Sequence, residues 1–107
     1  MTDDRSPASS SASPIGDLAD EVAEAVLAAP GVHALHGGAF GEVATYLPGR
    51  RVAGVRIRDT GCDVHVTVDW GASVHPTAAA IRASVRRLVA GAVDVTIEDV
   101  APRGGPT

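Results

Sequence analysis

Residues Val52 to Val100 have the sequence VAGVRIRDTGCDVHVTVDWGASVHPTAAAIRASVRRLVAGAVDVTIEDV, and this stretch contains the clearest structural pattern of the chain. Apolar and polar residues alternate on both sides of Thr60-Gly61, which predicts two strands joined by a tight turn. Trp70-Gly71 ends the second strand, and an amphipathic segment and a further alternating strand follow it. The stretch therefore predicts a compact α+β domain, and it contains no obvious catalytic cluster.

The alternation also predicts the pairing register of this hairpin. With Thr60-Gly61 as a two-residue turn, the apolar row of one strand faces the apolar row of the other. The facing pairs are then Asp59 with Cys62, Ile57 with Val64, Val55 with Val66 and Ala53 with Val68 on the apolar side, and Arg58 with Asp63 and Arg56 with His65 on the polar side. This register places Cys62 and His65 on opposite faces of the sheet.

The remaining elements follow from periodicity and from Pro and Gly positions. They are a helix over DLADEVAEAVLAA with Asp17 as its N-cap, ended by Pro30-Gly31; a strand VHAL at 32–35; a strand from Glu42 to Leu47 before the turn Pro48-Gly49; a second helix from Pro76 to about Ala90; and a last strand from Val93 to Val100. The predicted fold is α+β in two layers, in the order αβββαβ. Its two amphipathic helices lie on one face of a small mixed sheet, because each element has only one apolar side.

Composition divides the 107 residues into one domain with two tails. Residues 1–14 are rich in Ser and Pro and predict a disordered tail, 15–101 predict a single domain, and 102–107 predict a flexible C-terminus. The net charge is −4 without a block of like charges, which argues against nucleic-acid binding as the main activity. The N-terminus lacks the pattern of a signal peptide and no apolar run is long enough to span a membrane, so we expect a cytoplasmic protein.

Reactive side chains are few, and their spacing does not favour catalysis. His33, His36 and His65 are the candidate metal ligands, but residues three apart on a strand point to opposite faces. Cys62 is the only cysteine, and on the apolar face it predicts a buried thiol without an activating base. The segment Gly37–Gly41 lacks the spacing of a phosphate-binding loop and predicts a connector, with Phe40 as a core residue. We expect no catalytic residues, no cofactor and no metal.

Arginine is the most suggestive residue type, since all nine basic residues are Arg. The candidate interaction surface contains Arg50, Arg51, Arg82, Arg86 and Arg87. The first two lie at a predicted hairpin tip and the last three line the second helix, while the first helix is acidic. Complementary helices would pair within the domain or between copies of the chain; the alternative is that both faces are simply solvated.

The chain resembles the alkaline-shock-protein (Gls-type) family, small envelope stress response proteins of Gram-positive bacteria. The matching pieces are Pro30-Gly31-Val32, Gly54-Val55, Asp69-Trp70-Gly71, Val74-His75-Pro76, the Arg-bearing helix with Val85, and the closing VDVTIEDV strand. The resemblance covers about residues 17–101. The chain departs from the family in its short first helix, its compressed first two strands and its Arg-rich rather than Lys-rich polar faces.

The resemblance implies a non-enzymatic, self-associating cytoplasmic protein, often held at the membrane by a separate anchor protein and linked to cell-envelope stress. We therefore expect a scaffold or interaction module that acts by self-association and by docking a partner protein, such as a membrane-anchored one. The alternative is a small metal- or ligand-binding protein that uses His33, His36 and His65. Nucleic-acid binding through Arg82, Arg86 and Arg87 is a third hypothesis.

Overall fold

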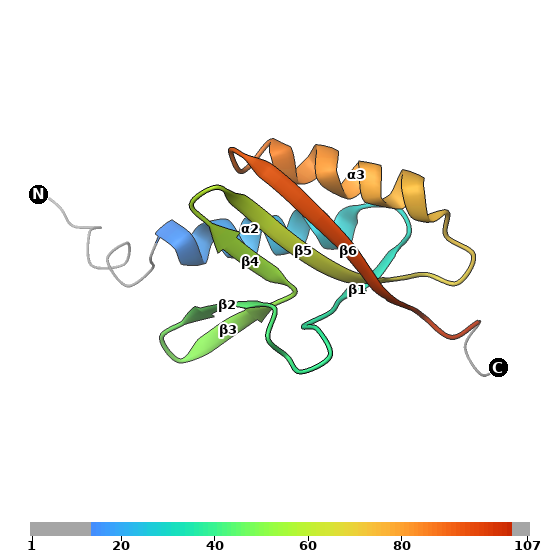
Figure 1. The fold of residues 1–107 in the computed structure, drawn as a ribbon, viewed down its shortest axis with the longest axis horizontal. Coiled ribbons are helices and arrows are strands. Elements are labelled where there is room, and N and C mark those ends of the chain that lie inside the picture. The colour runs from blue at the N-terminus through green and yellow to red at the C-terminus, as the bar shows by residue number, and fades with distance from the viewer. Residues whose placement is uncertain (1–13, 104–107) are drawn as a thin grey trace, which may run out of the picture.

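The computed structural model describes residues 14–103 (Figure 1). Its elements are α2 (Pro14–Ala28), β1 (Val32–Leu35), β2 (Ala44–Leu47), β3 (Arg50–Ala53), β4 (Val55–Arg58), β5 (Gly61–Val68), α3 (Val74–Arg86) and β6 (Ala92–Val100). The predicted tails lie almost wholly outside the described residues. Within the described residues no helix is long and apolar enough to cross a membrane.

The main sheet is built around β5. On one edge β6 runs parallel to β5 over its whole length. On the other edge two strands lie end to end and antiparallel to β5: β4 pairs with Gly61–Val64, and β1 pairs with Val66–Val68. The sheet is therefore mixed, as predicted, while β2 and β3 form a separate two-stranded hairpin.

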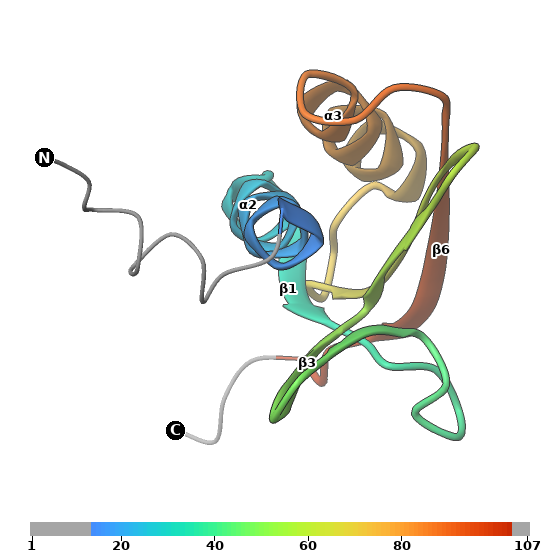
Figure 2. The ribbon, with the colours of Figure 1, turned by 90° about the vertical axis from the view of Figure 1, so that its left-hand side faces the viewer.

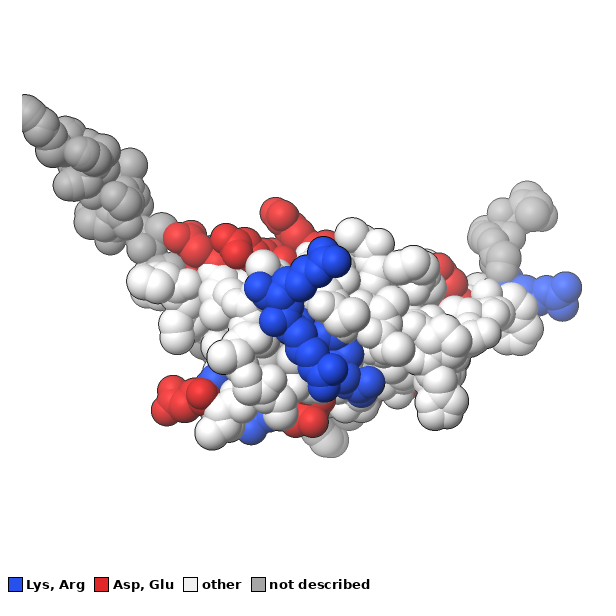
Figure 3. Space-filling model, turned by 90° about the horizontal axis from the view of Figure 1, so that it is seen from above, with Lys and Arg blue, Asp and Glu red and all other residues white. Residues whose placement is uncertain are grey.

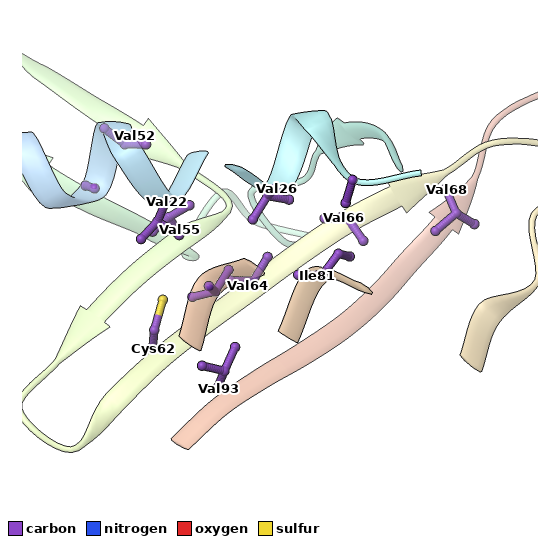
Figure 4. Packing of buried hydrophobic residues seen from close by; sticks show 13 residues of the cluster. Val22, Val26, Val52, Val55, Cys62, Val64, Val66, Val68, Ile81 and Val93 are labelled. Carbon is purple, nitrogen blue, oxygen red and sulfur yellow. The ribbon is translucent and has the colours of Figure 1, made fainter. Parts of the chain in front are cut away.

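Both helices cover the same face of the main sheet (Figure 2), which confirms the predicted α+β class and its two layers. Alternation along β5 directs one side chain in two toward the helices, where the strand buries Cys62 and its valines. The buried cluster is Ala19, Val22, Val26, Ala29, Val52, Val55, Cys62, Val64, Val66, Val68, Ile81, Val85 and Val93 (Figure 4). This core is aliphatic apart from one thiol, with no aromatic member.

The strand order corrects the predicted αβββαβ, because five strands separate the helices. Gly54 divides what the sequence predicts as one strand into β3 and β4, with φ at +85°. Its N–H donates to the Val43 carbonyl oxygen, and its own carbonyl oxygen accepts from the His65 N–H. The chain therefore passes from the small hairpin into the main sheet at Gly54.

The hairpin register also differs from the predicted one. Val55 pairs with Val64 and Arg58 with Gly61, so the turn is Asp59-Thr60. Gly61 belongs to the ladder instead of the turn, because β6 approaches it closely: a Cβ at Gly61 would overlap the Ala92 carbonyl oxygen. The shift is by two residues, and side chains on a strand alternate with a period of two, so every residue keeps its predicted face.

The helix ends are displaced from their predicted positions. α2 begins at Pro14, which places Asp17 in its first turn and not at its N-cap. α3 begins after Ser73 and ends at Arg86, well before Ala90. Pro14 is suited to a first helical turn because the backbone N–H groups of that turn have no acceptor within the helix, so the N–H that proline lacks removes no helical hydrogen bond.

Candidate functional site

The structure separates the two arginines predicted at the hairpin tip. Arg50 forms a bidentate ion pair with Asp20 of α2, with Nη1–Oδ1 and Nη2–Oδ2 distances of 3.1 and 2.9 Å. The hydrogen bond and charge of Asp20 raise the pKa of Arg50 above its ordinary value. Arg51 instead points to the preceding loop and donates to the Gly41 carbonyl oxygen at 3.3 Å. Arg50 thus joins the hairpin to the helix layer and is not a free basic side chain.

The α3 arginines remain together on the helix layer. Arg82 donates through Nε to the Val93 carbonyl oxygen of β6 at 3.2 Å. Arg86 and Arg87 are exposed and have no hydrogen bond or ion pair through their guanidinium groups to any other residue of 14–103. Seen from above, the basic side chains form a ridge over α3 beside an acidic band (Figure 3).

The three histidines do not converge on one site. His33 bonds Asp69 through Nδ1 at 3.2 Å, the Nδ1 of His36 accepts from the Gly38 N–H at 2.9 Å, and His65 pairs with Glu98 on the open face of the sheet. Across the described part of the chain no three His, Cys, Asp or Glu side chains are grouped to hold a metal ion. Each histidine therefore has a separate structural partner.

Cys62 is fully buried in the core, on the face opposite His65. Burial raises the pKa of the thiol from 9.0 to about 11, and the Asp63 charge adds to the shift. Its Sγ donates to the Asp63 carbonyl oxygen at 3.7 Å. A protonated, inaccessible thiol is a poor nucleophile, which agrees with the expectation from the sequence.

This burial predicts a pH dependence of stability. The unfolded thiol ionises near pH 9 and the folded thiol only near 11, so the free energy of unfolding should fall as the pH rises between these values. Denaturant unfolding at a series of pH values measures the decline. A Cys62→Ala variant should lose this part of the slope, and an identical slope in both proteins would contradict the assignment.

All three aromatic residues of the chain lie at the surface. Phe40 is 93% exposed, Tyr46 65% and Trp70 58%. The prediction that Phe40 is a core residue is therefore wrong. The chain leaves the main sheet after β1, and the valines and Ile81 already fill the space between sheet and helices, so no core position remains for the ring of a loop residue.

The loop that carries Phe40, residues 36–43, is held by its own hydrogen bonds. The Glu42 carboxylate accepts from the Phe40 N–H at 2.9 Å, and the Val43 N–H donates to the Gly37 carbonyl oxygen at 2.8 Å. Backbone hydrogen bonds from Glu42 itself and from Phe40 lower the pKa of the Glu42 carboxyl. The carboxylate therefore remains charged and holds the loop at neutral pH.

Side chains of the neighbouring strands bind the same loop from outside. Tyr46 Oη donates to the Gly41 carbonyl oxygen at 3.3 Å, the acceptor that Arg51 also uses. Arg56 Nη2 donates to the Glu42 carbonyl oxygen at 2.9 Å. We call Phe40, Tyr46 and Arg51 the aromatic loop surface. It is an ordered surface with an apolar side chain at its tip.

The exposure of Phe40 means that its ring contributes little to the stability of the fold. Burying a Phe side chain contributes roughly 1.5–3 kcal/mol, which an exposed ring forgoes. Tyr and Arg are enriched at the energetic centres of protein interfaces, and here Tyr46 and Arg51 both donate to the Gly41 carbonyl oxygen next to Phe40. The sequence offers one signal for this surface, a single Phe in a glycine-rich segment, and that signal is equally compatible with a core residue.

A shallow groove of about 360 Å³ lies between the end of α2 and the start of α3. Its lining residues are Pro30, Gly31, Ala72, Ser73, Pro76, Thr77 and Ala80. The lining has no ionisable side chain, so the groove itself provides no general acid or base.

No protein-family model, no curated protein and no solved structure matches this chain.

Proposed function

We propose that this protein is a non-enzymatic interaction module of the alkaline-shock type, which acts by self-association and by docking a partner protein. The observation that carries the proposal is Phe40, which is 93% exposed at the tip of a loop held by hydrogen bonds on both sides. A rigid loop loses little conformational entropy on binding, so a presented ring of this kind suits partner docking.

The distribution of reactive groups supports the same proposal. The one thiol is buried and protonated, with its pKa near 11, and the three histidines have separate partners. The groove between the helices has an apolar and weakly polar lining. These features suit a module that recognises surfaces better than one that activates a substrate.

The place of action follows from the family resemblance and belongs to the proposal. We propose a cytoplasmic protein that responds to cell-envelope stress and reaches the membrane through a separate anchored partner. The aromatic loop surface is the docking site that we assign to this partner. The partner should therefore present an apolar pocket for Phe40 with acceptor groups near Arg51.

The test is affinity purification from native cytoplasmic and membrane fractions with three baits. Wild-type protein should retain a specific partner, and Phe40→Ser should lose it with a decrease of at least about tenfold in bound amount. Trp70→Ser is the matched control, since it removes another exposed ring away from the loop. It should retain the partner.

The unfolding midpoints of both variants should lie close to that of wild type, because neither ring is in the core. Equal retention by wild type and Phe40→Ser would contradict the docking surface. A strict monomer at high concentration with no co-purifying partner would contradict the proposed function as a whole.

A further inference from the structure

We propose that the helix layer is a homodimer interface, in which the acidic row of α2 in one copy faces the basic end of α3 in a second copy. The inference rests on the self-association in the proposed function and names the surface that performs it. The occupant of this surface is a second copy of the same chain. Charge complementarity on the two helices carries the argument.

The acidic row consists of Asp17, Glu21 and Glu24. Their spacing of four and three residues places them along one side of α2, away from the buried Val22 and Val26. All three are exposed. Glu21 and Glu24 form no ion pair with any residue of the described range. Among the α2 carboxylates, Asp20 alone forms an ion pair within that range, and its partner is Arg50. Among the described residues, Glu21 and Glu24 therefore present negative charge without an ion-pair partner, while the charge of Asp17 also acts on Arg50.

The basic end of α3 consists of Arg86 and Arg87. Both are exposed at the last turn of the helix, and their guanidinium groups contact no carboxylate within residues 14–103. Their position at the helix C-terminus is favourable, because the helix dipole places partial negative charge there. Within residues 14–103 the two helices thus carry opposite charges that form no ion pair with each other.

The arrangement of the helices makes this surface self-complementary. α2 and α3 run in opposite directions along the molecule (Figure 1), so the acidic first half of α2 and the basic end of α3 lie toward the same end. They form the adjoining red band and blue ridge of Figure 3. A two-fold axis between the helices and parallel to them therefore brings each acidic row onto the basic end of the other copy, twice per dimer.

Other partners fit this surface less well. A nucleic acid or an acidic protein would meet the Glu21–Glu24 row beside the arginines, and the chain as a whole carries a net charge of −4. A basic partner would meet Arg86 and Arg87. The surface suits a partner that presents positive charge to the acidic row and negative charge to Arg86 and Arg87. A second copy related by the two-fold axis presents both.

Charge reversal tests the inference by sedimentation velocity over a range of concentrations. The acid-reversed variant is Glu21→Arg with Glu24→Arg, and the base-reversed variant is Arg86→Glu with Arg87→Glu. Each alone should dimerise about 10- to 100-fold more weakly than wild type, because attraction becomes repulsion in both contacts. An equimolar mixture of the two should recover dimerisation as a heterodimer, since both contacts then join opposite charges.

Two further measurements complete the design. Wild-type dimerisation should weaken in about 1 M NaCl, where the Debye length is about 3 Å. Circular dichroism and thermal unfolding check that each variant folds. A reversed variant that unfolds can be replaced by the single-site variants Glu24→Arg and Arg86→Glu in the same mixing design.

The outcomes separate this inference from the proposed function. Dimerisation unchanged by both reversals would overturn the helix interface and leave self-association through another surface. Loss in both variants without recovery in the mixture would also overturn it. A wild-type monomer that still captures a partner through Phe40 would overturn the dimer and retain partner docking.

Discussion

An Ile81→Ala variant is expected to unfold with a free energy about 3–4 kcal/mol lower than that of wild type. Ile81 is fully buried on α3 and is the largest side chain of the core, where it packs between the helix layer and the valines of β5 (Figure 4). Truncation removes apolar surface and leaves a cavity that a close-packed interior fills only in part. Urea or guanidinium unfolding measures the change.

The matched control is Ile15→Ala, the same substitution on the other helix. Ile15 is 49% exposed, so its truncation should cost less than about 1 kcal/mol. Similar losses in the two variants would show that α3 does not supply the central packing. In a domain of this size, a loss of 3–4 kcal/mol is a large fraction of a total stability of roughly 5–15 kcal/mol.

A Gly54→Ala variant is expected to lose about 2–4 kcal/mol of unfolding free energy. The backbone at Gly54 has φ of +85°, a conformation that costs an L-residue energy. A Cβ there would also lie 2.8 Å from Leu35 Cβ and 3.0 Å from both the His36 nitrogen and the His65 oxygen. Two of these three atoms are backbone, so relief would require the main sheet to move.

Gly49→Ala separates strain from the steric clash. Gly49 has φ of +77° in the β2–β3 turn, and a Cβ there would meet no atom within 4 Å. Its substitution should cost about 1–2 kcal/mol, the conformational part alone. Thermal unfolding of the two variants gives the comparison. Equal losses would mean that the junction of β1, β4 and β5 tolerates a side chain at Gly54.

The composition of the core is connected to the proposed function. Val, Ala and Ile fill the space between the sheet and the helices, and the rings of Phe40, Tyr46 and Trp70 remain outside. A small domain would gain stability by burying them. Their exposure on an otherwise well-packed fold is what favours an interaction module.

The strongest sequence predictions concern elements whose periodicity extends over several residues. The alternation of Cys62, Val64, Val66 and Val68 predicts their common burial, and the structure confirms it. Ile81 and Val85 lie four residues apart, one helical turn, and both are buried on α3. A shift of register by two residues leaves the face of each side chain unchanged but changes the residue that it pairs with on the other strand. The faces of the hairpin residues are therefore predicted correctly, and their cross-strand pairs are not.

The candidate surfaces depended more on tertiary contacts. Five arginines are predicted as one interaction surface, but Arg50 is paired with Asp20 across the layers and Arg51 bonds the loop. Among the arginines of that set, only Arg86 and Arg87 form neither a hydrogen bond nor an ion pair through their guanidinium groups within residues 14–103. No spacing in the sequence distinguishes a paired arginine from an unpaired one, because the partner of Arg50 lies thirty positions away.

Local sequence patterns are sufficient to predict the α+β class, the two helices, the face of each residue on β5 and the burial of Cys62. These depend on the periods of helix and strand, which are local properties of the chain. Tertiary contacts set the break at Gly54, the role of Gly61, the exposure of Phe40 and the charges on α2 and α3 that have no ion-pair partner within residues 14–103. Each of these depends on which segments, distant in sequence, come close together in space. The periodicity of a single segment contains no information on that proximity.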